Sequence, residues 1–131
     1  MQVGDMELED VDVARFMGAL RAGLGVAMFV APRKVVRSWT GEEGESLPST
    51  MALRGMAVRD IALGLGLAKA ADSGGRTRGW LEAAALSDAG DAVATLFSWR
   101  ELGGVRRIFW FAVEAGAAVL QMQLAEALDE D

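Results

Sequence analysis

The chain has 131 residues, enough for one domain with a single core, and 52% of them are hydrophobic, which is high for a small soluble domain. It contains no cysteine and no histidine, which excludes disulfides, thiol chemistry, thiolate-bound zinc and histidine-based acid–base catalysis. The net charge of −6 argues against nucleic acid as a partner. Acidic residues gather in residues 1–12 and 126–131, which we expect to be solvated tails.

Four apolar segments follow one another along the chain, and each is predicted to be a helix. They cover residues 14–32, residues 51–70 (which a serine–threonine pair precedes as possible helix caps), residues 80–99 between two tryptophans, and residues 105–128. Alanine and leucine dominate, and no segment alternates as a strand does. We therefore expect one all-α domain over residues 1–131, a four-helix bundle with up-down-up-down topology.

Charged residues inside these segments leave a soluble bundle open as an alternative. No segment reaches the run of about 18 uncharged residues that marks a plain transmembrane helix. A central arginine or aspartate costs roughly 2.5–3.5 kcal/mol on membrane insertion, whereas a soluble bundle turns such residues toward water. The residues concerned are Arg21, Arg59, Asp60, Asp88, Asp91 and Glu114.

The pattern around these charges nevertheless favours a membrane. A soluble amphipathic helix needs a continuous polar face, but residues 22–32 and 61–68 are apolar on all sides. A chain of this length cannot bury four such helices completely. We therefore predict a transmembrane bundle, a multi-pass protein of the inner (plasma) membrane, with the lipid bilayer as its first partner.

The third segment carries its polar residues on one stripe. Ser87, Asp88, Asp91, Thr95 and Ser98 follow helical spacing, and the opposite face is apolar. In a membrane bundle this stripe faces the interior, where polar groups find partners. Glycines of the neighbouring segments are expected to allow close packing there, namely Gly18, Gly23, Gly25, Gly55, Gly64 and Gly66.

The polar residues are expected to pair across helices. Arg59 is predicted to bind Asp88 or Asp91, because an unpaired arginine in an apolar bundle is costly and its fork suits a carboxylate. Asp60 lies about 100° further round the same helix and is expected to face Arg21.

Arg21 and Glu114 offer a further pair. Two interior arginines then face four carboxylates, so at least one carboxylate needs a proton, a hydrogen bond, water or a cation. This network is either a structural set of salt bridges, which we favour, or a proton or ion relay or a polar ligand pocket.

Basic residues predict the orientation. The first and third connections together hold seven lysines and arginines, while the opposite side holds three, or four with Arg15. By the positive-inside rule, the first and third connections are cytoplasmic and both termini lie outside.

Two quoted stretches carry a resemblance to known proteins. They are "RGMAVRDIALGLGLA" (54–68) and "RGWLEAAALSDAGDAV" (78–93), in which an Arg-Asp pair precedes a Leu/Gly-rich helix and an Asp-containing helix follows. This order resembles the small four-helix bacterial membrane proteins grouped as an uncharacterised family, a domain of unknown function. The resemblance implies a membrane fold and no particular activity.

We expect the protein to be an accessory or scaffold subunit of a larger membrane complex, bound to other membrane subunits or to itself. One alternative is a small carrier or channel that uses the buried carboxylates, and another is a soluble helical bundle that binds an apolar ligand. We expect no enzymatic activity, no catalytic residues, no cofactor and no bound metal, because no base to activate a nucleophile and no ligand motif is present.

Overall fold

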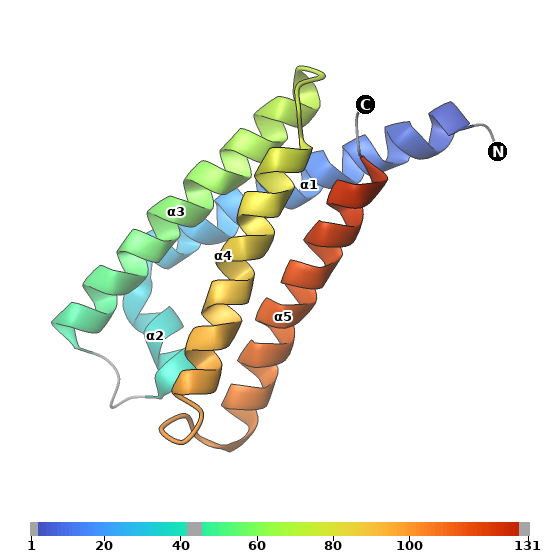
Figure 1. The fold of residues 1–131 in the computed structure, drawn as a ribbon. Coiled ribbons are helices and arrows are strands. Elements are labelled where there is room, and N and C mark those ends of the chain that lie inside the picture. Colours follow the sequence, from blue (N-terminus) through green and yellow to red (C-terminus); the bar gives the residue numbers. More distant parts are fainter. Residues whose placement is uncertain (1–2, 42–45, 129–131) are drawn as a thin grey trace.

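A computed structural model describes residues 3–41 and 46–128, which form five helices and no strand. Each of the four long helices runs opposite to the next long one, and a short helix lies at one end of the bundle (Figure 1). The all-α prediction is confirmed, whereas the predicted count of four helices is wrong. The helices are α1 (Val3–Val30), α2 (Pro32–Thr40), α3 (Leu47–Asp72), α4 (Arg78–Phe97) and α5 (Gly104–Ala127).

Helix α2 is the element that the sequence analysis missed. Helix α1 ends at Val30, and Pro32 begins α2, where a proline is tolerated because the first helical N–H groups lack partners anyway. The helix buries Pro32 and Val36 and exposes Arg33 and Lys34. The sequence analysis counted this segment in the connection that follows the first helix.

Helix α3 begins earlier than expected. The side chain of Ser46 accepts a hydrogen bond from the Ser49 backbone N–H at 3.3 Å, and Pro48 lies in the first turn. Ser49 and Thr50, predicted as possible caps, therefore lie inside the helix.

Helices α1 and α3 pack closely through small residues. A Cβ atom added to Gly64 would lie 2.5 Å from the Gly18 carbonyl oxygen and 2.5 Å from the Ala22 backbone nitrogen. The two backbones approach this closely only because both positions lack side chains, as in small-residue contacts between membrane helices. Gly23 and Gly55 were expected to share this role but face open space.

The acidic tails lie partly within the described residues: Leu8 and Glu9 are exposed, as expected of a solvated tail, whereas Leu128 is buried. Helix α1 already begins at Val3, so most of the acidic stretch at residues 1–12 is helical, while residues 1–2 and 129–131 lie outside the described residues. Leu128 is 6% exposed and belongs to a buried cluster at this end of the bundle. The cluster consists of Ala14, Leu67, Ala71, Leu81, Leu124, Ala125 and Leu128.

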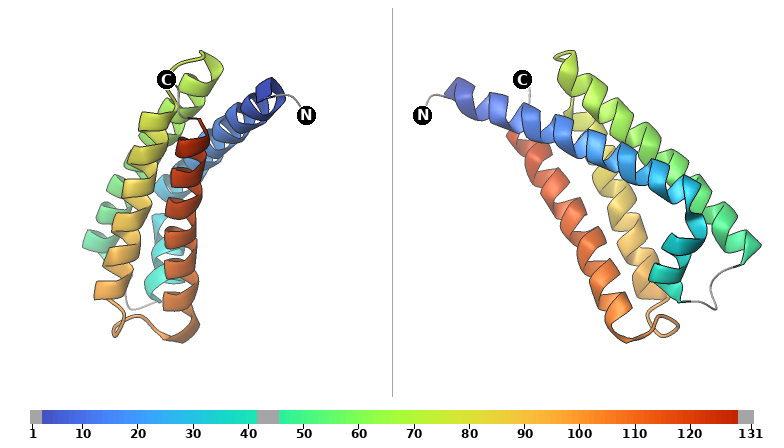
Figure 2. Two further views of the ribbon diagram at one scale, coloured as in Figure 1. Left: turned by 45° about the vertical axis from the view of Figure 1, so that its right-hand side comes forward. Right: turned by 180° about the vertical axis from the view of Figure 1, so that it is seen from behind.

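The outer surface of the long helices is apolar. Exposed large apolar side chains far outnumber the buried ones, and Leu86 and Phe97 of α4 are 75% and 87% exposed. The buried apolar positions are mostly alanine and leucine. The long helices pack mainly in two pairs, α1 with α3 and α4 with α5 (Figure 2).

Candidate functional site

Arg21 of α1 connects all four long helices. Its Nη1 donates to Asp60 Oδ1 of α3 at 2.9 Å, and its Nη2 forms an ion pair with Asp88 of α4. The same Nη2 also donates to Gln121 Oε1 of α5 at 3.3 Å. The side chains of Arg21, Asp60 and Asp88 are only 12–16% exposed, so these contacts lie inside the bundle.

Arg59 forms the second ion pair. Its Nη1 and Nη2 donate to the two oxygens of Asp91 at 3.1 and 2.8 Å, a two-point contact that suits the planar guanidinium. Its Nε also donates to Asp60 Oδ1 at 3.3 Å, so both arginines share Asp60. These are the pairings of Arg59 with Asp91 and of Asp60 with Arg21 that the sequence suggested.

Gln121 joins the network although the sequence analysis did not include it. Its Nε2 donates to the Asp88 carboxylate and to the Ala117 carbonyl oxygen, the latter at 2.9 Å. It lies two turns after Glu114 on the same helix face and is 3% exposed. The seven-residue spacing of two polar residues in an apolar helix was the signal available in the sequence.

Glu114 of α5 takes neither arginine as a partner, so the expected Arg21–Glu114 pair is wrong. Its Oε2 accepts a hydrogen bond from the Thr95 hydroxyl at 2.8 Å, and its Oε1 has no hydrogen-bond partner among the described residues. The residue is 6% exposed. Both terminal nitrogens of Arg21 donate instead to Asp60, Asp88 and Gln121.

The network therefore holds more carboxyl groups than guanidinium groups. The two arginines, Arg21 and Arg59, form ion pairs with three aspartates. Glu114 pairs with neither arginine and accepts a hydrogen bond from the Thr95 hydroxyl. A buried polar group without a partner is costly, so Glu114 is the one member that the fold itself does not satisfy.

A cavity of about 440 Å³ lies beside this network. We call it the α1–α5 cavity, because most of its wall comes from these two helices. Its walls are mainly large apolar side chains, and Phe16, Leu24 and Leu120 at its rim are exposed, so the cavity opens on the outer surface. Its polar lining consists of Arg21, Asp60, Asp88, Asp91, Glu114 and Gln121.

Helix α2 covers one end of this cavity. Trp39 of α2 stacks on Trp110 of α5 with ring centroids 5.0 Å apart, and Trp110 Nε1 donates to the Ser38 carbonyl oxygen at 3.2 Å. Both rings line the α1–α5 cavity. The missed helix therefore contributes directly to the site.

Two further properties of the described residues bear on this site. In residues 3–41 and 46–128, no group of three or more carboxylates is arranged to hold a metal ion. Two helices, over Leu8–Val30 and Gly104–Ala127, are long and apolar enough to cross a membrane, which by itself is weak support for a membrane location. These are the two helices that form most of the cavity wall.

Comparison of the chain with protein-family models, curated proteins and solved structures finds no match. The resemblance to the uncharacterised four-helix membrane family therefore stays a prediction.

Proposed function

We propose that this chain is a small integral membrane protein that acts as an accessory or scaffold subunit of a larger membrane complex. Its four long helices cross the bilayer as an up-down-up-down bundle. The observation that carries this proposal is the distribution of side chains: ionised residues pair inside, while large apolar residues cover the outside. A water-soluble protein has the opposite arrangement, and contiguous apolar surface of this extent marks contact with lipid or with another protein.

Helix lengths support this proposal. Helix α4 is the shortest of the four at 20 residues, which corresponds to about 30 Å, the thickness of a typical hydrocarbon core. The two most apolar stretches, in α1 and α5, are only 22% and 28% buried. The core helix of a soluble protein is mostly buried, so these two helices do not fit that alternative.

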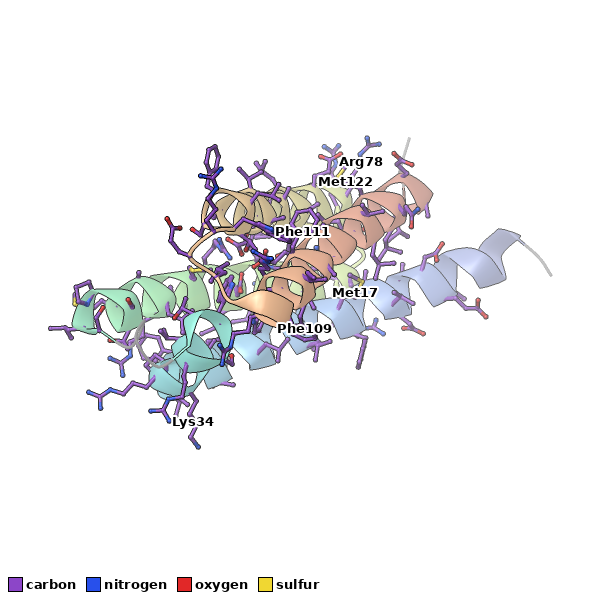
Figure 3. All side chains as sticks on the ribbon, turned by 90° about the horizontal axis from the view of Figure 1, so that it is seen from below. Met17, Lys34, Arg78, Phe109, Phe111 and Met122 are labelled. Atoms are coloured by element: carbon purple, nitrogen blue, oxygen red, sulfur yellow. The ribbon has the colours of Figure 1, made fainter. Side chains whose placement is uncertain are left out.

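The end of the bundle that carries α2 suggests the orientation. This helix is amphipathic, with Val36 buried and with Arg33 and Lys34 exposed, and Lys34 projects outward from it (Figure 3). A short basic amphipathic helix with a tryptophan is suited to the membrane–water interface. By the positive-inside rule this end faces the cytoplasm, and both termini lie outside.

Cysteine labelling tests the membrane location, because the chain has no cysteine of its own. Single variants Leu86→Cys, Ser38→Cys and Ser73→Cys are treated with a membrane-impermeant maleimide in intact and in permeabilised cells. We expect Leu86→Cys to resist labelling in both, because lipid or a neighbouring membrane helix covers it, although it is 75% exposed in the chain alone. We expect Ser73→Cys to react in intact cells and Ser38→Cys only after permeabilisation. Rapid labelling of Leu86→Cys would place the chain in water and favour the soluble alternative.

The outer face of α4 supports a role as a subunit. Gly79, Ala83, Gly90 and Ala94 are all exposed and fall on one stripe, and a Cβ atom at either glycine would meet nothing within 4 Å. Small residues four positions apart let another membrane helix approach closely.

Substitution on this face tests the subunit role. We expect Gly90→Ile to lower the mass of the complex that the full chain forms in mild-detergent extracts of its native membrane. Gly116→Ile is the matched control, since Gly116 is an exposed glycine on α5 that also faces open space. If the wild-type chain migrates at its own mass, or if both variants behave alike, this role is wrong.

A small carrier or channel is a second candidate, and Glu114 is the observation that favours it. A buried carboxylate without an arginine is a typical feature of proton and cation pathways in membranes. The test is proton or cation flux into proteoliposomes that contain wild type, Glu114→Gln or Asp88→Asn. Equal flux with all three proteins and with empty liposomes would reject this candidate.

A further inference from the structure

We propose that the α1–α5 cavity binds a small lipophilic ammonium ion, whose N–H group donates to Glu114 and whose apolar body fills the cavity. This goes beyond a scaffold role, because it assigns a binding site and a ligand class. Three observations lead to it: the unmatched charge, the unpartnered carboxylate oxygen and the nature of the cavity walls.

The balance of charge selects a cation over an anion. Both arginines of the network are engaged, Arg21 by Asp60 and Asp88 and Arg59 by Asp91, so neither is left to attract an anionic ligand. Glu114 adds a fourth carboxylate with no arginine. The network thus holds four carboxyl groups against two guanidinium groups, and an entering cation offsets this difference.

The position of Glu114 identifies the point of contact. The residue lines the cavity and is more than nine-tenths buried, and its Oε1 is itself covered and has no hydrogen-bond partner among the described residues. The Thr95 hydroxyl donates to Oε2 at 2.8 Å, so binding requires the carboxylate to turn about this contact until Oε1 meets the ligand. An ammonium N–H supplies the missing donor and also the opposite charge, which makes the hydrogen bond a strong one.

The cavity walls define the rest of the ligand. A volume of about 440 Å³ lies within the range of small-molecule sites, and mainly apolar walls with a few convergent polar groups are typical of such sites. Phe16, Trp39 and Trp110 place aromatic rings in the wall, and aromatic faces attract cations. The opening between α1 and α5 is lined by exposed apolar side chains, so a lipophilic ligand can enter from that side.

A matched pair of probes tests the charge requirement. The full chain, purified in mild detergent, is titrated with 1-naphthylmethylammonium and with 1-naphthalenemethanol, which have nearly the same shape and differ in charge. Heat of binding is measured against detergent alone. We expect wild type to bind the ammonium at least about tenfold more tightly than the alcohol, the ratio expected for a charged hydrogen bond.

Two variants separate the roles of the carboxylate and the cavity. Glu114→Gln should remove the preference for the ammonium and leave the affinity for the alcohol unchanged, while Glu101→Gln, an exposed control between α4 and α5, should change neither affinity. Ala117→Phe places a ring in the cavity wall and should weaken binding of both probes about tenfold or more.

Three results would overturn the proposal: no binding of either probe to wild type, equal binding of the two probes, or a preference that survives in Glu114→Gln. Circular dichroism and gel filtration confirm that each variant is folded before titration. Because binding is measured on purified protein, the result does not depend on the location of the chain or on its partners. The maleimide experiment can therefore reject the membrane location while the binding proposal holds. Likewise, the titration can reject the binding proposal while the membrane location holds.

Discussion

Helix α1 has two faces that are built in opposite ways. Toward α3 it presents Gly18, Ala22 and Gly25, and the two backbones lie in direct contact. Toward α5 it presents Phe16, Leu24 and Arg21, and a cavity separates the helices (Figure 2 shows the two ribbons diverging). Small residues thus give a rigid interface, whereas large residues around one arginine give an open one.

Stability and function therefore reside on different faces of α1. The α1–α3 interface depends on shape, since any added atom meets backbone. Between α1 and α5, Arg21 donates to Gln121 beside the cavity, and apolar contacts gather at one end, in the buried cluster that holds Ala14 and Leu124. Mutations on the two faces should therefore differ both in size and in mechanism.

The largest effect is expected at the α1–α3 interface. Gly64→Leu places a side chain where even a Cβ atom lies 2.5 Å from the backbone of α1, so α1 and α3 must separate. We expect no folded protein, measured by far-UV circular dichroism and gel filtration in mild detergent. Gly116→Leu on the outer face of α5 should leave folding unchanged, because nothing lies within 4 Å of that position. Equal behaviour of the two variants would break the comparison.

The second-largest effect is expected where Arg21 binds Asp60 and Asp88. Arg21→Ala leaves Asp60 with only its long contact to Arg59 and leaves Asp88 without a cation, so the free energy of unfolding should fall by about 3–5 kcal/mol. Titration with SDS in mixed micelles, followed by circular dichroism, measures the loss. Replacement of the three residues together by methionine and leucine should restore much of it, because no unpaired charge then remains. A triple variant no more stable than Arg21→Ala would contradict this account.

Arg59→Ala should have a smaller effect than Arg21→Ala, about 2 kcal/mol. Arg59 is 33% exposed, compared with 14% for Arg21, and its loss leaves one carboxylate, Asp91, without a cation. The same SDS titration compares the two variants. A larger loss for Arg59→Ala would show that Arg59, and not Arg21, holds the bundle together.

Glu114→Gln should have the smallest effect and the opposite sign. The amide can still accept a hydrogen bond from Thr95, while the buried charge is removed, so the free energy of unfolding should rise by about 1 kcal/mol. SDS titration of this variant beside Glu101→Gln checks the sign. A decrease would mean that the Glu114 carboxylate is satisfied within the fold.

Much of the site could be predicted because its members follow helical spacing. Asp88 and Asp91 lie on one stripe of α4, and the high cost of an unpaired arginine predicted that Arg59 would meet one of them. Gln121 was missed because an amide gives a weaker signal than a charge. Its spacing of two turns from Glu114 was the available clue.

The cavity and its covering helix could not be predicted. Helix α2 is a short charged segment, and its packing depends on the contact of Trp39 with Trp110, which lies far away in the sequence. Several acceptors compete for Arg21, and in the fold it binds Asp60, Asp88 and Gln121 and not Glu114. Such a choice among acceptors is set by distances in the folded chain.

The all-α class, the approximate extents of α3, α4 and α5 and most of the polar residues that face inward could be read from the sequence, whereas the start of α1 at Val3 could not. These properties follow from local rules, because helical periodicity places residues on faces and apolar runs exclude other structures. The tertiary structure alone decided that α1 packs tightly on α3 and loosely on α5, and hence that a cavity borders Glu114. The physical reason is that small residues permit close approach but do not choose the neighbour, which is settled only when all helices pack together.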